Sequence, residues 1–343
     1  MIGDVLTSSI LFEVLRKQYP KAELHYLIQK HTEPVVRENP FIDLIIFDQT
    51  DKNGNQIKFL RFLNRIKTEK YDVVIDVYSK IGSSLITAAS GADKKIGYKK
   101  WYTSSLYTHT LEYNLSPETK AGLAIENRLK LLEPLKFDFN EAIRPKIYLT
   151  QSELVSAKKF LKEAKVNPQN KLIMIGMLGS SENKTYPLPY LAKVLDTIVL
   201  ETRANLLLNY IPTQKEQVEE LLSHCKSQTL KFIHQNVYGK SLREFMALTA
   251  NCDALIGNEG GAINMAKALS IPTFAIFSPW ISLEAWASYQ NDLNASVHLK
   301  NYKPELYIKK YPKELKPESH TLYKEFKPEF FNSRLREFLN KLA

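Results

Sequence analysis

The chain has 343 residues, which is long for a single hydrophobic core, so two domains of about 150 residues each are expected. Hydrophobic residues make up 44% of the chain and charged residues 24%, a balance that excludes bulk disorder. The 47 lysines and arginines against 37 acidic residues give a net charge of +10. This charge favours anionic partners, which composition leaves open as nucleic acid, phosphorylated sugars or a membrane surface.

The cysteine content and the hydropathy of the chain bear on its compartment. Cys225 and Cys252 have neither metal-ligand spacing nor an evident disulfide role, which fits a reducing environment. No apolar stretch reaches the ~18 residues that a membrane-spanning helix needs, and the first residues do not resemble a signal peptide. We therefore expect a cytoplasmic protein.

The first half of the chain alternates between helical and strand-like patterns. Apolar residues recur at helical spacing over 4–18, and short apolar runs predict strands at 22–28, 43–48 and 72–77. Alternation of this kind is typical of parallel sheets covered by helices.

A second series of the same kind begins near residue 171. Strands are predicted at 171–177, 204–210, 231–234, 253–257 and 273–277, with helices around 191–198, 213–222, 241–250 and 261–269. The sequence thus predicts an α/β protein with two doubly wound domains, 1–150 and 151–300. The tail, 301–343, is rich in Lys, Pro and aromatic residues, and we expect an irregular surface segment there before a last helix near 332–342.

Ligands of such folds bind beyond the carboxyl ends of the strands. Three turns of the second domain follow predicted strands: 176–187, 209–216 and 257–264. In the last of these, Gly260 and Gly261 let backbone N–H groups approach a ligand, and the following helix offers its N-terminus to a phosphate.

Chemical groups in these turns suggest a nucleotide sugar. Glu259 would repel phosphate but accept hydrogen bonds from sugar hydroxyls, while Ser180, Ser181 and Lys184 suit phosphate. The alternatives are that the glycines only serve a tight turn and that 179–184 is a solvated loop. Asp4, near a helix N-terminus, is either an N-cap or a general base.

Taken together, the motifs resemble the heptosyltransferase family of ADP-heptose:lipopolysaccharide glycosyltransferases, in family order over residues 1 to about 280. The matching stretches are Gly3-Asp4-Val5-Leu6, then Gly179-Ser180-Ser181 with Lys184 and Pro187, Gly239-Lys240-Ser241-Leu242-Arg243-Glu244, and Gly257-Asn258-Glu259-Gly260-Gly261 with Asn264 and Pro272-Thr273.

The resemblance implies two Rossmann-like domains facing across a cleft, the GT-B architecture, with the acceptor bound by the N-terminal domain and the nucleotide sugar by the C-terminal one. It implies inverting, metal-independent transfer of a heptose from an ADP-sugar to the inner core of lipopolysaccharide, without a cofactor. Asp4 would be the general base and Lys184 would stabilise the diphosphate. The implied donor-binding residues are Gly179, Ser180, Ser181, Lys184, Gly257, Asn258, Glu259, Gly260, Gly261 and Asn264.

A basic stretch of the first domain, 91–102, is the expected acceptor contact. Its lysines, Lys94, Lys95, Lys99 and Lys100, would meet the anionic core at the cytoplasmic face of the inner membrane, with peripheral membrane contact. The alternative is a solvated basic turn. Nucleic-acid binding is not expected, because no recognised module accompanies the charge.

The sequence also departs from the family pattern. Glu259, Gly260 and Asn264 stand where the family has Asp, Thr and His, and Tyr186 replaces a Trp. Only two residues precede Gly3, where the family has its first strand, so we expect that strand to be missing from the N-terminal domain. A GT-B protein that binds a nucleotide or glycan without turnover is therefore the alternative function.

Overall fold

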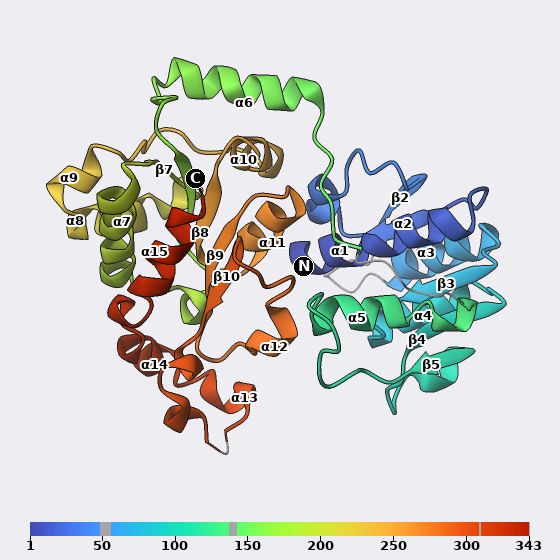
Figure 1. Cartoon of the computed structure of the whole chain (residues 1–343). Helices are drawn as coiled ribbons and strands as arrows, with labels where there is room; N and C mark the ends of the chain where they lie inside the picture. The colour runs from blue at the N-terminus through green and yellow to red at the C-terminus, as the bar shows by residue number, and fades with distance from the viewer. Residues whose placement is uncertain (49–55, 137–142, 309, 343) are drawn as a thin grey trace. The chain divides into compact units, whose positions relative to one another are not determined.

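The computed structural model describes residues 1–48, 56–136, 143–308 and 310–342 and divides the chain into two compact units, Met1–Pro145 and Lys146–Ala343 (Figure 1). Both units consist of parallel strands and helices, which is the predicted α/β class. Among the described residues, no helix has the length and apolar character to cross a bilayer.

The first unit begins with two consecutive helices rather than the single helix expected over 4–18. Its elements are α1 (Ile2–Ser8), α2 (Ile10–Gln18), β1 (His25–Ile28), β2 (Leu44–Phe47), α3 (Gln56–Thr68), β3 (Val73–Asp76), α4 (Ile81–Ala89), β4 (Lys94–Tyr98), β5 (His109–Leu111) and α5 (Leu123–Lys130). The three predicted strands are present as β1, β2 and β3. Ser9 lies between the two helices with helical backbone angles, so the break between them is slight.

The strands of the first unit form two separate sheets. β1 pairs in parallel with β2, and β3, β4 and β5 form a second parallel sheet; no pairing among the described residues joins β1 to β3. Side chains of β1 contact neighbouring segments instead: His25 Nδ1 lies 2.9 Å from the hydroxyl of Tyr71, which precedes β3, and Leu27 packs on a cluster that includes Phe62 of α3. The predicted absence of a family first strand before Gly3 stays a prediction.

The second unit is a five-stranded parallel sheet in the order β10-β9-β8-β6-β7. Its strands are β6 (Leu172–Gly176), β7 (Asn205–Leu208), β8 (Ala254–Asn258), β9 (Thr273–Ile276) and β10 (Asn294–Val297). Its helices are α6 (Gln151–Glu163), α7 (Leu188–Thr202), α8 (Lys215–His224), α9 (Ser227–Leu230), α10 (Leu242–Thr249), α11 (Gly261–Ala268), α12 (Leu283–Trp286), α13 (Pro312–Leu315), α14 (Ser319–Glu325) and α15 (Asn332–Asn340). Every residue of β6, β7, β8 and β9 is buried, as expected of parallel strands covered on both faces.

Four strand assignments differ from expectation, one of them the three-residue β5, which was not predicted. Residues 231–234 follow directly on α9 and make only an isolated bridge, Leu206 to Ile233, so the strand predicted there is wrong. β10 was not predicted because its four residues, Asn-Ala-Ser-Val, do not form an apolar run. β4 lies within 91–102, the stretch that was predicted to be either the acceptor contact or a solvated basic turn. Its first residue, Lys94, is exposed, while Ile96 and Tyr98 are buried.

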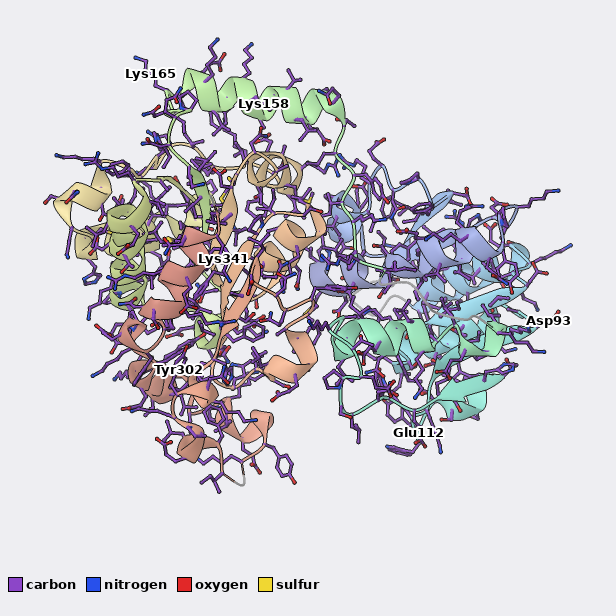
Figure 2. The ribbon with its side chains drawn as sticks, viewed as in Figure 1. Asp93, Glu112, Lys158, Lys165, Tyr302 and Lys341 are labelled. Atoms are coloured by element: carbon purple, nitrogen blue, oxygen red, sulfur yellow. The ribbon has the colours of Figure 1, made fainter. Side chains whose placement is uncertain are left out.

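The tail is part of the second unit's core, which corrects the expectation of an irregular surface segment before the last helix. Phe326, Phe331 and Leu335 are fully buried, and the Tyr186 ring packs against Phe326 and Phe331. Tyr302, labelled in Figure 2, packs against Phe326 as well. Burying such side chains removes a large apolar area from water, which accounts for their inward position. The last helix is present as α15.

One ion pair anchors α6 to α10 and gives a pH-dependent prediction. Arg243 is 8% exposed and donates to the Glu153 carboxylate from both Nε and Nη2, which lowers the pKa of Glu153 to about 2. Glu153→Gln removes this carboxylate from the guanidinium, so at pH 7 we expect a loss of roughly 2–3 kcal/mol in the free energy of unfolding. Because the folded pKa lies below the ordinary 4.5, this contribution is present above pH 4.5 and is lost as the pH falls toward 2.

Urea unfolding of wild type and Glu153→Gln at pH 7 and pH 3 checks this expectation. Glu201→Gln is the control, because Glu201 pairs with Arg336, which is half exposed, and such pairs contribute about 0–1 kcal/mol. A difference from wild type that is as large at pH 3 as at pH 7 would contradict the assignment.

Candidate functional site

Three loops of the second unit meet at the carboxyl edge of its sheet, following β6, β8 and β9. The loop after β9 is tied to the loop after β6, because Ser278 Oγ and Trp280 Nε1 both donate to the carbonyl oxygen of Asn183, at 2.8 and 2.9 Å. Two of these loops were predicted as ligand-binding turns. The loop after β9 was missed, although it also follows a predicted strand.

Asn258, at the end of β8, acts inside the protein. Its side chain is buried; its amide nitrogen donates to the carbonyls of Gly176 and Met177, and its Oδ1 accepts from the Tyr186 N–H at 2.6 Å. These bonds use the donors of the amide, so Asn258 positions the loops rather than offering donors to a ligand. Tyr186 is buried too, and its hydroxyl donates to the Phe326 carbonyl.

The glycine at the β8 end is required by close packing, which gives a second prediction. Gly257 has φ +147°, and a Cβ there would lie 2.3 Å from the Gly176 carbonyl oxygen, whereas Gly260, with φ +140°, has open space around it. We expect Gly257→Ala to lower the free energy of unfolding by about 3 kcal/mol or more, because backbone must shift in addition to the strain of the positive φ. Gly260→Ala, with strain alone, should cost about 1–2 kcal/mol. Thermal denaturation of both variants checks the order, and equal losses would contradict it.

The N-terminus of α11 offers backbone donors at the same edge. Gly260 is its N-cap residue, and no side chain in the described part of the chain caps the first turn, so the N–H groups of its first residues are available to a ligand. Asn264 lies in this helix, is partly exposed and makes no side-chain hydrogen bond within the described residues.

In the loop after β6, Ser180 and Ser181 lie exposed, and Ser181 Oγ donates to Asn183 Oδ1. Gly179 donates its N–H to Thr185 Oγ1.

The charged pair of the site is Lys184 and Glu259. Lys184 Nζ lies 3.9 Å from Glu259 Oε1, and the two side chains are 27% and 11% exposed. Glu259 Oε1 is buried and has no hydrogen-bond partner within the described residues, and burial raises the pKa of Glu259. A buried carboxylate oxygen without a donor carries a desolvation cost, which a ligand hydroxyl would offset.

Asp4, in the first unit, lies in the first turn of α1, as expected of a helix N-terminus. It is not the N-cap, since Met1 takes that position. Arg128 of α5 donates to Asp4 Oδ1 at 3.0 Å, and the Tyr78 hydroxyl donates to Oδ2 at 3.1 Å. Arg128 also donates to Ser8 Oγ, so the carboxylate is held by groups from two other segments. Burial and the neighbouring Asp4 raise the pKa of Tyr78 to about 12.

The four lysines predicted to contact the acceptor lie on β4 and just after it. Lys94 is exposed, Lys95 Nζ donates to the Ala92 carbonyl, and Lys100 Nζ donates to the Tyr78 carbonyl. Lys99 pairs with Glu112, at 2.8 Å. Figure 2 labels Glu112 on the surface of this unit. Trp101, which directly follows Lys100 in the chain, is 94% exposed.

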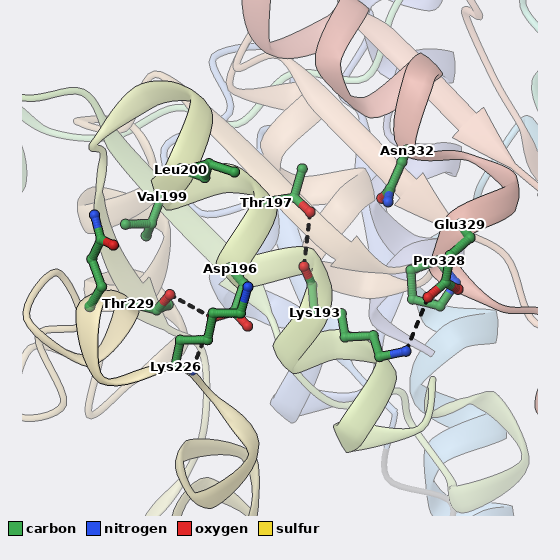
Figure 3. A pocket seen from close by; sticks show the side chains of 11 residues that line it. Lys193, Asp196, Thr197, Val199, Leu200, Lys226, Thr229, Pro328, Glu329 and Asn332 are labelled. Atoms are coloured by element: carbon green, nitrogen blue, oxygen red, sulfur yellow. Dashed lines mark hydrogen bonds and ion pairs between the residues drawn. The ribbon is translucent and has the colours of Figure 1, made fainter.

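Two other polar places in the second unit are less suited to bind a ligand. In the predicted turn after β7, Tyr210 packs against Tyr238 and donates to the Gln235 carbonyl. A hollow of about 330 Å³ beside α7 contains charged groups that are already paired (Figure 3). There Lys193 binds Glu329 at 3.0 Å, and Asp196 accepts from the Thr229 hydroxyl and the Lys226 N–H.

Comparison with known proteins agrees with the family resemblance that the sequence motifs carry. The model of glycosyltransferase family 9 (heptosyltransferase) matches residues 59–314, more than half of the chain. Lipopolysaccharide heptosyltransferase 1 of Campylobacter coli is 24% identical over 311 residues, covering 87% of this chain and 85% of that protein.

Solved structures of glycosyltransferases share the fold. The glycosyl transferase family 9 structure from Veillonella parvula superposes with a TM-score of 0.74 at 19% identity, covering 95% of each chain. The E. coli heptosyltransferase WaaC with ADP superposes with a TM-score of 0.62 at 14% identity, covering 98% of this chain and 96% of that one. The fold is thus the predicted one of the GT-B heptosyltransferases. The chain belongs to glycosyltransferase family 9, the heptosyltransferase family, and is a glycosyltransferase.

Proposed function

We propose that the protein transfers a heptose from ADP-heptose to the inner core of a lipopolysaccharide, with inversion at the anomeric carbon. The observation that carries this proposal is the combination of Lys184, the buried Glu259 and the uncapped N-terminus of α11 at one sheet edge. A cation and free N–H groups suit a diphosphate, while a carboxylate oxygen without a donor suits a sugar hydroxyl. ADP as the nucleotide is supported by the likeness to a heptosyltransferase solved with ADP.

The donor half of the reaction is departure of ADP. As the bond from the anomeric carbon to the phosphate oxygen breaks, negative charge grows on the diphosphate. Lys184 and the N–H groups at Gly260 and Gly261 would stabilise that charge, together with the Ser180 and Ser181 hydroxyls. Glu259 would orient the sugar by accepting from its hydroxyls. This scheme assigns the whole charge stabilisation to protein groups, and we propose that the transfer needs neither a metal ion nor a cofactor.

The acceptor half needs a base for the attacking hydroxyl. Asp4 fits this role because its carboxylate is held in place by Arg128 and Tyr78. The acceptor oxygen would lose its proton to Asp4 while it attacks the anomeric carbon on the face opposite the leaving ADP. The products are the extended acceptor and ADP.

The acceptor itself is proposed to be anionic and presented at the cytoplasmic side of the inner membrane. Lys94, Lys95, Lys99 and Lys100 supply positive charge beside the exposed Trp101, and an aromatic ring next to lysines suits a lipid-water interface. We expect Trp101→Ala to reduce co-sedimentation of the protein with vesicles that contain anionic lipid. Unchanged co-sedimentation would remove this contact from the proposal.

The second candidate function is binding of a nucleotide sugar without turnover. It is favoured by Gly260 and Asn264, which stand where the family has Thr and His, and by the longer Glu259 in place of Asp. The two functions separate in one experiment with a panel of nucleotide sugars that includes ADP-heptose, measuring both affinity and nucleotide release with a lipopolysaccharide core acceptor. Acceptor-dependent release of ADP supports transfer, whereas tight binding without release supports the alternative.

A further inference from the structure

Trp280, in the loop after β9, is held firmly beside the candidate donor site. Its indole nitrogen donates to the carbonyl of Asn183, and Ser278 of the same loop donates to the same oxygen. Asn183 directly precedes Lys184 in the chain. The ring therefore has a fixed position relative to the lysine that is expected to bind phosphate.

Two lysine ammonium groups lie over this one ring. Lys184 Nζ is 5.3 Å from the ring centroid, and Lys316 Nζ, which follows α13, is also 5.3 Å from it. Both distances are within the range of a cation–π contact. Because each lies 5.3 Å from the same centroid, the two ammonium groups are at most twice 5.3 Å apart, although 132 positions separate the two residues in the sequence.

Little negative charge balances these two cations. Within the described residues Lys316 forms no ion pair, and the nearest carboxylate to Lys184 is Glu259 at 3.9 Å. Burial raises the pKa of Glu259, which weakens it as a counter-charge. Two neighbouring positive charges repel each other, and an anion bound between them would relieve this cost.

A hollow of about 460 Å³ adjoins this arrangement. Lys316 lines it together with Asn183 and Tyr323, and the Tyr323 hydroxyl is buried without a hydrogen-bond partner in the described part of the chain. Lys316 supplies positive charge to this hollow, which Glu182 also lines.

We propose that Lys316, positioned by Trp280, is a second phosphate-binding residue of the donor site, so that Lys184 and Lys316 together bind the diphosphate of the nucleotide sugar. The inference rests on the proposed function, because it assumes a nucleoside diphosphate at this sheet edge. It adds a binding residue from the C-terminal segment, outside the motifs that carry the family resemblance.

Calorimetric titration with ADP at fixed ionic strength tests this assignment. Removing a charge-assisted hydrogen bond to phosphate should raise the Kd of Lys316→Ala for ADP about tenfold or more. Trp280→Leu should also raise the Kd, since the ring that positions both lysines is lost. Lys324→Ala is the matched control, an exposed lysine of the same C-terminal segment without a contact to the ring, and its Kd should equal that of wild type. The Kd for AMP, which has one phosphate fewer, should rise less than the Kd for ADP when Lys316 is replaced.

The outcomes separate the inference from the function. If ADP binds wild type and Lys184→Ala weakens it while Lys316→Ala does not, the inference is overturned and the proposed function stands. If neither ADP nor inorganic pyrophosphate binds wild type, both the donor site and the inference are overturned. Lys316→Gln and a melting curve for each variant exclude a folding defect, which is not expected at an exposed side chain.

Discussion

Asp4→Asn is expected to lower kcat for glycosyl transfer by about 10²–10⁴-fold, the usual effect of losing a general base. The Asn side chain keeps the size of Asp; its oxygen can still accept from Arg128 and its NH2 group can donate to the Tyr78 hydroxyl, but it cannot take the acceptor's proton. Because Asp4 belongs to the first unit and the donor residues to the second, the Kd for ADP should change by less than about twofold. Steady-state kinetics together with ADP titration measure both quantities.

The control for Asp4→Asn is Asp72→Asn, the same chemical change at an exposed position of the same unit that lies outside the expected acceptor contact. Its kcat should match that of wild type. Melting curves are needed as well, because Asp4→Asn leaves Arg128, which is 13% exposed, without its carboxylate. A folded Asp4→Asn protein with wild-type kcat would show that Asp4 is only a structural partner of Arg128.

Lys184→Ala has the second large expected effect, on the leaving group. Loss of one group that stabilises charge in the transition state typically lowers kcat by about 10²–10³-fold, so we expect a loss in this range. The Kd for ADP should also rise about tenfold, because the ammonium meets the diphosphate in the ground state too. The two effects are separated by measuring kcat at saturating donor and the Kd by titration.

Lys193→Ala is a close match as control for Lys184→Ala. Lys193 also lies near an aromatic ring, that of Tyr190 at 5.8 Å, and near a carboxylate, that of Glu329, but it belongs to α7 (Figure 3). Its removal should leave kcat and the Kd for ADP unchanged. If both variants lose activity equally, the effect is not specific to the donor site, and Lys184 loses its proposed role.

The sequence predicted the second unit's sheet well for a physical reason. Strands covered on both faces read as unbroken apolar runs, and β6, β7, β8 and β9 all lie within or very near the predicted ranges. β4 was missed as a strand because it begins with two lysines. The tail was misjudged because lysines and prolines dominate its composition, whereas Phe326 and Phe331 determine how it packs.

The site was predicted only in part, because local sequence patterns do not show which residues the fold brings together. The motifs located Lys184, Glu259 and the α11 turn, but no local pattern distinguishes Asn258, which holds the loops from inside, from a residue that touches the ligand. Trp280 could have been found by applying the strand-end rule to the run at 273–277. Lys316 could not, since only the fold brings it to the ring shared with Lys184.

The central claim is that this chain transfers a sugar from ADP-heptose to a lipopolysaccharide core. The most direct test is the mass of a purified inner-core acceptor after incubation with the protein and ADP-heptose, alongside the ADP formed. The account predicts that the acceptor grows by one heptose for each ADP released, and that Asp4→Asn reduces both rates equally. An acceptor of unchanged mass, with ADP-heptose demonstrably bound to the folded protein, would contradict it and indicate a binding protein.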